Sequence, residues 1–104
     1  MAETSKSERR INKRISFIKD VEVVWVGRRR SWDLSIGGIY LETVISFPTG
    51  GILDLRFKLN AEDDHSIQVQ STVLYEHTGI GIGLCFVNLS PENRGKIQKL
   101  VDQD

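Results

Sequence analysis

Residues 53–59 have the sequence Leu-Asp-Leu-Arg-Phe-Lys-Leu, and this stretch decides the fold class. Its apolar residues are Leu53, Leu55, Phe57 and Leu59, and its charged residues are Asp54, Arg56 and Lys58. Strict alternation of apolar and charged residues is typical of a β-strand that buries one of its two faces. We therefore predict a strand here, with its apolar side packed against a core.

The same period of two recurs on both sides of this stretch. The apolar members are Val21, Val23 and Trp25 before it, and Ile67, Val69, Val73, Tyr75, Ile82, Leu84 and Phe86 after it. Glycine-containing segments predict a hairpin turn at 27–29, a break at 36–38 and a loop at 47–51, and 60–65 is a polar turn. About six short strands with turns every 8–12 residues predict an all-β domain, either a small sandwich or a closed barrel.

The last part of the chain has helical rather than extended character. Ser90 is a preferred N-cap residue, Pro91 suits the first turn, and Glu92 suits the positive end of the helix dipole. Ile97, Leu100 and Val101 then recur at helical spacing. We predict a helix over 90–103 that docks one apolar face on the β-domain.

The composition indicates one ordinary globular domain of 104 residues. No apolar run approaches the roughly 20 residues that a membrane span needs, and residues 1–14 are too polar for a secretory signal. We therefore expect a cytoplasmic protein without membrane insertion. Cys85 is the single cysteine, so an intramolecular disulfide is excluded, and its apolar neighbours predict a buried, unreactive thiol.

The residues needed for catalysis or for binding a metal are scarce. His65 and His77 are both near predicted turns, where histidines are usually only solvated. The sequence contains no zinc-type Cys/His cluster, no phosphate-binding Walker loop and no Gly-x-Ser-x-Gly motif. We expect neither an enzyme nor a protein with a metal or other cofactor.

An arginine-rich segment near the N-terminus is the first candidate binding motif. Arg10 and Arg14 are four residues apart, and Arg9 precedes them. The guanidinium group pairs bidentately with phosphate and with O6 and N7 of guanine, and its plane stacks on bases. Taken alone, such a segment is more often a solvated basic tail.

The segment Asp33-Leu34-Ser35-Ile36-Gly37-Gly38 is the second candidate motif. Asp33 and Ser35 share one face of a strand, where an ionised carboxylate accepts the N–H groups of a guanine edge. Ser35 can donate to a phosphate or accept from an arginine, and Gly38 permits close approach or a positive φ. Taken alone, the segment is at least as often a plain strand end with a turn.

Together the two motifs resemble the signature of the PilZ domain family. That signature is Arg-x-x-x-Arg in an N-terminal arm, followed about 20 residues later by Asp/Asn-x-Ser-x-x-Gly, and Arg10, Arg14, Asp33, Ser35 and Gly38 match it without departure. Residues 81–86 and 89–92 are also similar to the family. The resemblance covers nearly the whole chain. It rests on the order and spacing of the motifs, because each motif alone has low specificity.

The resemblance implies a six-stranded antiparallel β-barrel with a C-terminal helix, in a single domain. Residues 1–14 would be a flexible arm, 15–89 the barrel and 90–103 the helix. Many family members bind the bacterial second messenger cyclic di-GMP.

The resemblance also implies roles for individual residues in binding this ligand. Arg10 and Arg14 would bind guanine edges and phosphates, Asp33 and Ser35 would hold a guanine from the barrel, and Gly38 would allow close packing. Arg9 occupies a position that influences whether one or two ligand molecules stack, and an arginine favours two. Tyr75 lies where relatives often place an aromatic residue near the ligand, although a core tyrosine is an equally good interpretation.

The favoured hypothesis is a cyclic di-GMP receptor or adaptor that signals to a protein partner when the ligand orders the arm. Two alternatives stay open. One is a PilZ-like module that has lost the ligand and only binds protein. The other is a small barrel that binds single-stranded nucleic acid through Trp25, Trp32, Tyr40 and Tyr75. A net charge of zero, from 14 basic and 14 acidic residues, argues against nucleic acid as the partner.

Overall fold

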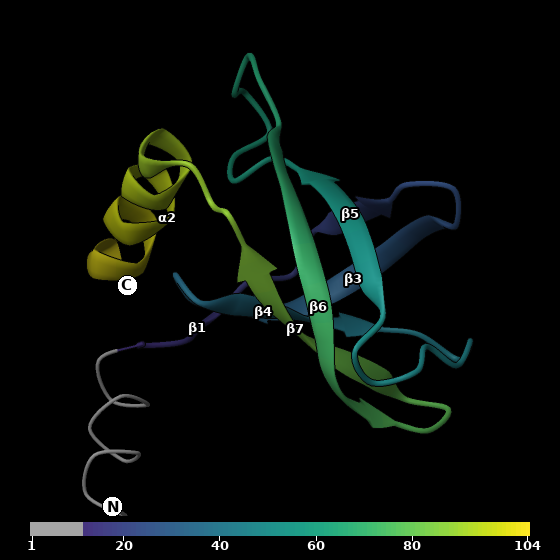
Figure 1. Cartoon of the computed structure of the whole chain (residues 1–104). Helices are drawn as coiled ribbons and strands as arrows, with labels where there is room; N and C mark the ends of the chain where they lie inside the picture. Colours follow the sequence, from purple (N-terminus) through teal and green to yellow (C-terminus); the bar gives the residue numbers. More distant parts are fainter. Residues whose placement is uncertain (1–11) are drawn as a thin grey trace, which may run out of the picture.

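The computed structural model describes residues 12–104, which form seven β-strands followed by one long helix (Figure 1). The strands are β1 (Ile15–Ser16), β2 (Asp20–Val23), β3 (Gly27–Leu34), β4 (Gly38–Glu42), β5 (Ile52–Phe57), β6 (Ile67–His77) and β7 (Gly81–Val87), and the helix is α2 (Pro91–Gln103). All strand pairs are antiparallel.

Six of the strands, β2 to β7, close into a barrel. The order β3-β2-β5-β6-β7-β4 becomes a ring because β4 also pairs with β3. Strand β1 adds to the same edge of β3 that β2 uses: β2 pairs with Gly27–Arg30 and β1 with Asp33–Leu34. The predicted six-stranded antiparallel barrel with a C-terminal helix is confirmed.

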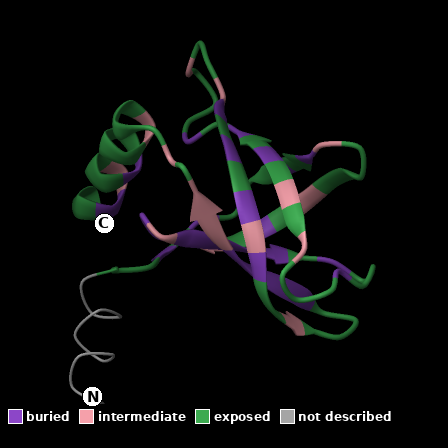
Figure 2. Ribbon diagram, viewed as in Figure 1, coloured by how far each residue is buried: buried purple, intermediate pink, exposed green. Residues whose placement is uncertain are grey.

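The core fills the barrel with the apolar face of each strand. Side chains with almost no exposure are Val21, Val23, Leu34, Ile39, Leu41, Leu55, Val73 and Ile82. In the stretch 53–59, Leu55, Phe57 and Leu59 are buried while Asp54, Arg56 and Lys58 are exposed, so the predicted alternation is confirmed. Figure 2 shows a similar alternation along the first part of the long strand β6, up to Val73. It breaks at Leu74 and Tyr75, which are both exposed, because the register of β6 against β7 shifts there, so Tyr75 does not share the core face with Val73.

Ser31 holds the barrel together at the gap between β1 and β2. Its hydroxyl is completely buried, donates to the carbonyl of Phe17 and accepts from the backbone N–H of Lys19 at 3.1 Å. These bonds satisfy backbone groups that the interrupted strand would otherwise leave without partners. Strands β1 and β2 therefore stay aligned on β3 on either side of the gap.

Helix α2 begins as the sequence predicts and docks on the core. Ser90 Oγ accepts from the backbone N–H of Asn93 at 3.1 Å, and Ile97 and Val101 are buried against the barrel. The last turn, 100–103, has the sequence Leu-Val-Asp-Gln. Lys13 supplies a cation there by donating to the carbonyl oxygen of Asp104 at 2.8 Å, a favourable charge for a helix C-terminus.

The hairpin turn predicted at 27–29 is wrong, because the turn lies at 24–26 and β3 already begins at Gly27. Arg28 lies opposite Glu22 and Arg30 opposite Asp20, and opposite charges on facing strand positions favour pairing. Arg28 and Arg30 are therefore exposed residues of a strand, not of a hairpin tip. Trp25 does not join the core face with Val21 and Val23, because it lies in the turn with φ 71° and is 99% exposed.

The expectation of a buried Cys85 is also wrong. Strand β7 directs Ile82 and Leu84 into the core, so the alternation places Cys85 on the outer face, where it is partly exposed. Its thiol contacts the carbonyl oxygen of Phe86 at 3.7 Å.

Candidate functional site

Arg14 joins the two sequence motifs. Its Nε and Nη2 donate to Oδ1 of Asp33 at 2.9 and 2.7 Å, and its Nη1 donates to Oγ of Ser35 at 3.3 Å. The side chains of Arg14 and Asp33 are 45% and 37% exposed, so the pair lies open to solvent. An exposed cation and carboxylate thus meet at the surface, and the hydroxyl that the arginine also contacts lies buried beneath them.

These residues meet because of the pairing between β1 and β3. Ile15 lies opposite Leu34 and Ser16 opposite Asp33, so Arg14, just before β1, extends toward the residue that follows β3. The backbone pairing of β1 with β3 therefore brings Arg14 next to the Asp-x-Ser segment. Arg9 and Arg10 lie outside the described residues.

Ser35 organises the turn that connects β3 to β4. Its Oγ accepts from the backbone N–H groups of Gly37 and Gly38 at 3.1 and 3.2 Å, and its own N–H donates to the carbonyl of Gly38 at 2.9 Å. The side chain is fully buried. Ser35 therefore accepts from an arginine, as the sequence analysis allows, and it also fixes the shape of the turn from a buried position, which the sequence analysis did not predict.

Gly38 lets this turn lie close to β7, and Gly37 lies beside Asn12. A Cβ on Gly38 would stand 2.0 Å from the carbonyl oxygen of Leu84, so no side chain fits between β4 and β7 there. A Cβ on Gly37 would stand 3.5 Å from Nδ2 of Asn12, which places the amide of Asn12 beside the turn. Asn12, inside the Arg-x-x-x-Arg segment, is a neighbour of the site that the sequence analysis missed.

A β-bulge places Trp32 beside Asp33 on the outside of the barrel. The register of β3 against β4 shifts between Ser31 and Asp33, so Asp33 lies opposite Tyr40. A bulge inserts one residue, so that two successive side chains are no longer on opposite faces. The Trp32 ring stacks on the ring of Tyr40 with the centroids 4.9 Å apart.

Tyr75 lies on the same outer face but farther from the arginine. It is on β6, is 45% exposed, and its ring centroid is 6.3 Å from that of Tyr40. Burial raises the pKa of Tyr40, and the neighbouring Tyr75 and Asp33 raise it further. The structure thus brings Arg14, Asp33 and Ser35 into contact, and links Tyr75 to them through Tyr40.

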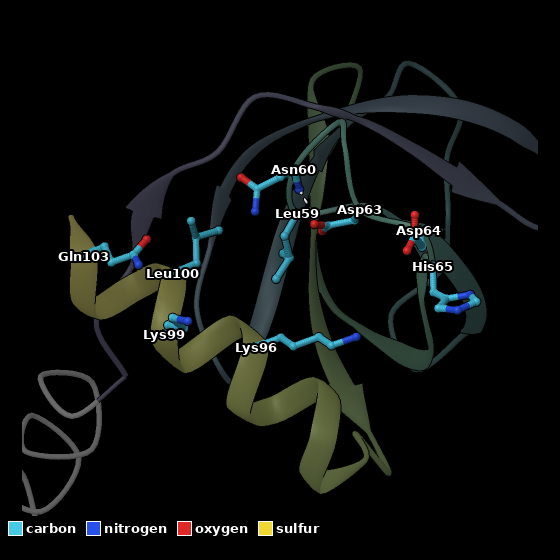
Figure 3. Close-up of a pocket in the computed structure, with 9 residues that line it drawn as sticks. All are labelled: Leu59, Asn60, Asp63, Asp64, His65, Lys96, Lys99, Leu100 and Gln103. Carbon is cyan, nitrogen blue, oxygen red and sulfur yellow. Dashed lines mark hydrogen bonds between the residues drawn. The ribbon is translucent and has the colours of Figure 1, made fainter.

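A concave pocket of about 450 Å³ lies elsewhere, between α2 and the loop that connects β5 to β6 (Figure 3). Its lining includes Lys96 and Lys99 from the helix, and Asp63, Asp64 and His65 from the loop. None of the motif residues lines it. The exposed Arg14–Asp33 pair presents the donors and acceptors that a nucleobase edge needs and contains the motif residues, so it is the better candidate for a nucleotide site.

The described residues, 12–104, contain neither a candidate metal site nor a helix that could span a membrane. No group of three or more His, Cys, Asp or Glu residues there could hold a metal ion. No helix in the same part of the chain is long and apolar enough to cross a membrane.

Comparison with known proteins gives a family and a fold. The family model described as PilZ domain matches residues 5–103. The Bacillus subtilis inhibitor of motility (MotI/DgrA) has a similar structure, with a TM-score of 0.79 and 21% identity over 91% of this chain and 50% of that chain. YcgR from Escherichia coli, solved in complex with c-di-GMP, has a TM-score of 0.65 and 19% identity over 91% of this chain and 45% of that chain.

The chain therefore spans about half the length of each of these two proteins. At these identities the likeness shows a shared fold. A comparison with curated protein sequences found no match.

Proposed function

This chain belongs to the PilZ domain family, and from that membership we propose that it is a cyclic di-GMP receptor that signals to a protein partner. The observation that carries the proposal is the contact of Arg14 with Asp33 and Ser35. In this proposal the protein is a receptor and not an enzyme, and it uses no cofactor. The crystal structure of YcgR in complex with c-di-GMP gives support from a protein of the same fold.

The chemistry of the contact suits a guanine edge. Guanine presents O6 and N7 as acceptors for an arginine, and N–H groups as donors for a carboxylate. Both bonds that Arg14 makes to Asp33 end on Oδ1, so the other carboxylate oxygen can accept from the ligand while the ion pair persists. An exposed ion pair contributes at most about 1 kcal/mol, so the ligand can also replace it.

The remaining motif residues act around this point in the proposal. Arg10, four residues before Arg14, binds a phosphate or the second guanine, and Arg9 favours the stacking of two ligand molecules. Gly38 keeps the turn close to β7, and Tyr75 lies against a base. When the ligand binds, residues 1–14 close on the barrel and present a changed surface to the partner.

The first test is a calorimetric titration with cyclic di-GMP. We expect saturable heat from the wild type, and the stoichiometry then distinguishes one bound molecule from two. In Arg14→Ala the affinity should fall roughly tenfold to a hundredfold, because charge-assisted hydrogen bonds are lost.

Arg56→Ala is the matched control. Arg56 pairs with Glu22 at 3.2 Å, and its side chain is 46% exposed, almost the same as Arg14. This variant should bind like the wild type. The proposal is wrong if folded wild-type protein gives no heat at high ligand concentration, or if both arginine variants lose the same affinity.

A further inference from the structure

Four rings form a continuous row on the outer face of the barrel. They are Trp32 on β3, Tyr40 on β4, and Tyr75 and His77 on β6, and we name them the aromatic surface. Trp32 stacks on Tyr40 at 4.9 Å between centroids, and Tyr75 lies 6.3 Å from Tyr40 and 5.1 Å from His77. The row thus crosses from β3 to β6 without interruption.

Strand β7 contains two glycines that let the rings lie flat across it. A Cβ on Gly81 would stand 2.5 Å from Cε1 of Tyr40, and a Cβ on Gly83 would stand 2.3 Å from Cζ of Tyr75. Both glycines belong to the outward series of β7, because Ile82 and Leu84 face the core. The rings of Tyr40 and Tyr75 therefore occupy the space that side chains on β7 would take.

Hydrogen bonds fix three of these rings, those of Trp32, Tyr40 and His77, while Trp32 and Tyr75 stay partly open to solvent. A hydrogen bond of 2.9 Å joins the Tyr40 hydroxyl to Nδ1 of His77, and Trp32 Nε1 donates to Oε1 of Glu42 at 3.0 Å. Burial raises the pKa of Tyr40 above the ordinary tyrosine value, at which the hydroxyl is already protonated at neutral pH. Tyr40 is 5% exposed, but Trp32 and Tyr75 are 42% and 45% exposed.

The aromatic surface begins at the ligand motif itself. Trp32 is the residue before Asp33, and the bulge directs both side chains outward. Tyr40 faces Asp33 across the strand pair and carries the Trp32 ring. A purine whose edge reaches the Asp33 carboxylate therefore has an indole ring as its immediate neighbour.

We propose that Trp32 stacks on a purine ring of the bound ligand, and that Tyr40 and His77 are positioning residues that hold the aromatic surface in place. Stacking on indole suits any purine because every base has a flat π-face, so Trp32 adds affinity while Arg14 and Asp33 select guanine. The inference rests on the proposed function and extends the ligand surface beyond the two motifs and Tyr75.

The two tryptophans of the chain allow a direct spectroscopic test. Trp25 is in the turn at the far end of β3, about 20 Å from Trp32 at the rise of an extended strand, and is 99% exposed. In Trp25→Phe the fluorescence comes from Trp32, and in Trp32→Phe it comes from Trp25. We expect cyclic di-GMP to quench the fluorescence of Trp25→Phe with the midpoint found by calorimetry, and to leave that of Trp32→Phe unchanged.

Calorimetry on further variants completes the test. Trp32→Ala should raise the Kd roughly tenfold or more, as removal of a stacking ring does, and Trp32→Phe should raise it less. Tyr40→Phe keeps the ring but loses the bond to His77, and should weaken binding only modestly. Thermal melting without ligand shows whether each variant folds. If Trp32→Ala does not fold, the Kd of Trp32→Phe provides the test.

The outcomes separate this inference from the proposed function. Suppose that Trp32→Ala and Trp32→Phe bind cyclic di-GMP with the same Kd as the wild type, and that the ligand does not change the fluorescence of Trp25→Phe. The inference is then overturned, while the proposed function stands. If the wild type gives no heat, both proposals fail. Equal quenching of Trp25 and Trp32 would indicate a global change and would also contradict stacking on Trp32.

Discussion

Gly38 and Gly83 both lack room for a side chain, but for different physical reasons. At Gly38 the obstacle is backbone, the carbonyl oxygen of Leu84, which is fixed by the pairing of β4 with β7. At Gly83 the obstacle is the ring of Tyr75, a half-exposed side chain that can rotate toward solvent. The same substitution should therefore have unequal effects.

We predict that Gly38→Ala lowers the free energy of unfolding by about 2–3 kcal/mol, because backbone must shift to admit the methyl group. Gly83→Ala should lower it by no more than about 1 kcal/mol, since Tyr75 can give way. Urea denaturation of the two variants beside the wild type measures both values. Equal losses would show that the Tyr75 ring is as rigid as the strand backbone.

At this scale the sequence predicts the site better than it predicts the aromatic surface around it. The spacing of the motifs and the family resemblance anticipate that Arg14, Asp33 and Ser35 meet. The outward direction of Trp32 cannot be anticipated, because a bulge breaks the period of two on which the analysis depends. The prediction that Trp25 continues the apolar series of Val21 and Val23 is wrong for a related reason, since Trp25 occupies a turn with positive φ.

Among the elements, α2 has a stabilising N-cap residue but a glycine of low helix propensity in its interior. Ser90 caps the first turn by accepting from the N–H of Asn93. Gly95 is exposed, and a Cβ built on it meets nothing within 4 Å. Glycine in a helix interior only increases the entropy lost on folding, so this position can accept a side chain without steric cost.

We predict that Gly95→Ala raises the free energy of unfolding by about 0.5–1 kcal/mol and that Ser90→Ala lowers it by about 1 kcal/mol. The two variants change the same helix in opposite directions, so each is the control of the other. Thermal melting followed by circular dichroism measures both shifts. A Gly95→Ala variant that melts below the wild type would mean that the glycine serves another purpose.

Local patterns predict these elements well, and pairing between distant residues limits the rest. The stretch 53–59 and the cap at Ser90 carry their structure in their own sequence. The turn before β3 does not, because its position is set by the register of β2 against β3, in which Val23 lies opposite Gly27. A glycine next to three arginines suggests a turn in the sequence, yet its pairing with β2 makes this glycine the first residue of a strand.

For the whole molecule, closure of the barrel depends on β4, which pairs with β7 on one edge and with β3 on the other. Alternation predicts strands but not which strands pair, so the residues alone leave a sandwich and a barrel open. The family resemblance resolves this choice. Closure also sets the geometry of the site, since the closing pair of β3 with β4 places Tyr40 opposite Asp33.

Hydrogen exchange tests the proposed response of the molecule to its ligand. We predict that cyclic di-GMP slows amide exchange in residues 5–15 and in the turn 35–38, because charge-assisted bonds hold these segments together. Strand β5, far from the motifs in the pairing order, should exchange at an unchanged rate. If calorimetry shows binding while residues 5–15 keep their exchange rates, closure of this segment is not the signal.

The bond from Lys13 to the carbonyl of Asp104 means that the two chain ends of the domain leave the barrel at one corner. A nucleotide that replaced the ion pair of Arg14 with Asp33 would also shift the neighbouring Lys13 relative to the end of α2. In a longer polypeptide, ligand binding to this domain would then change the angle between the domains attached at its two ends.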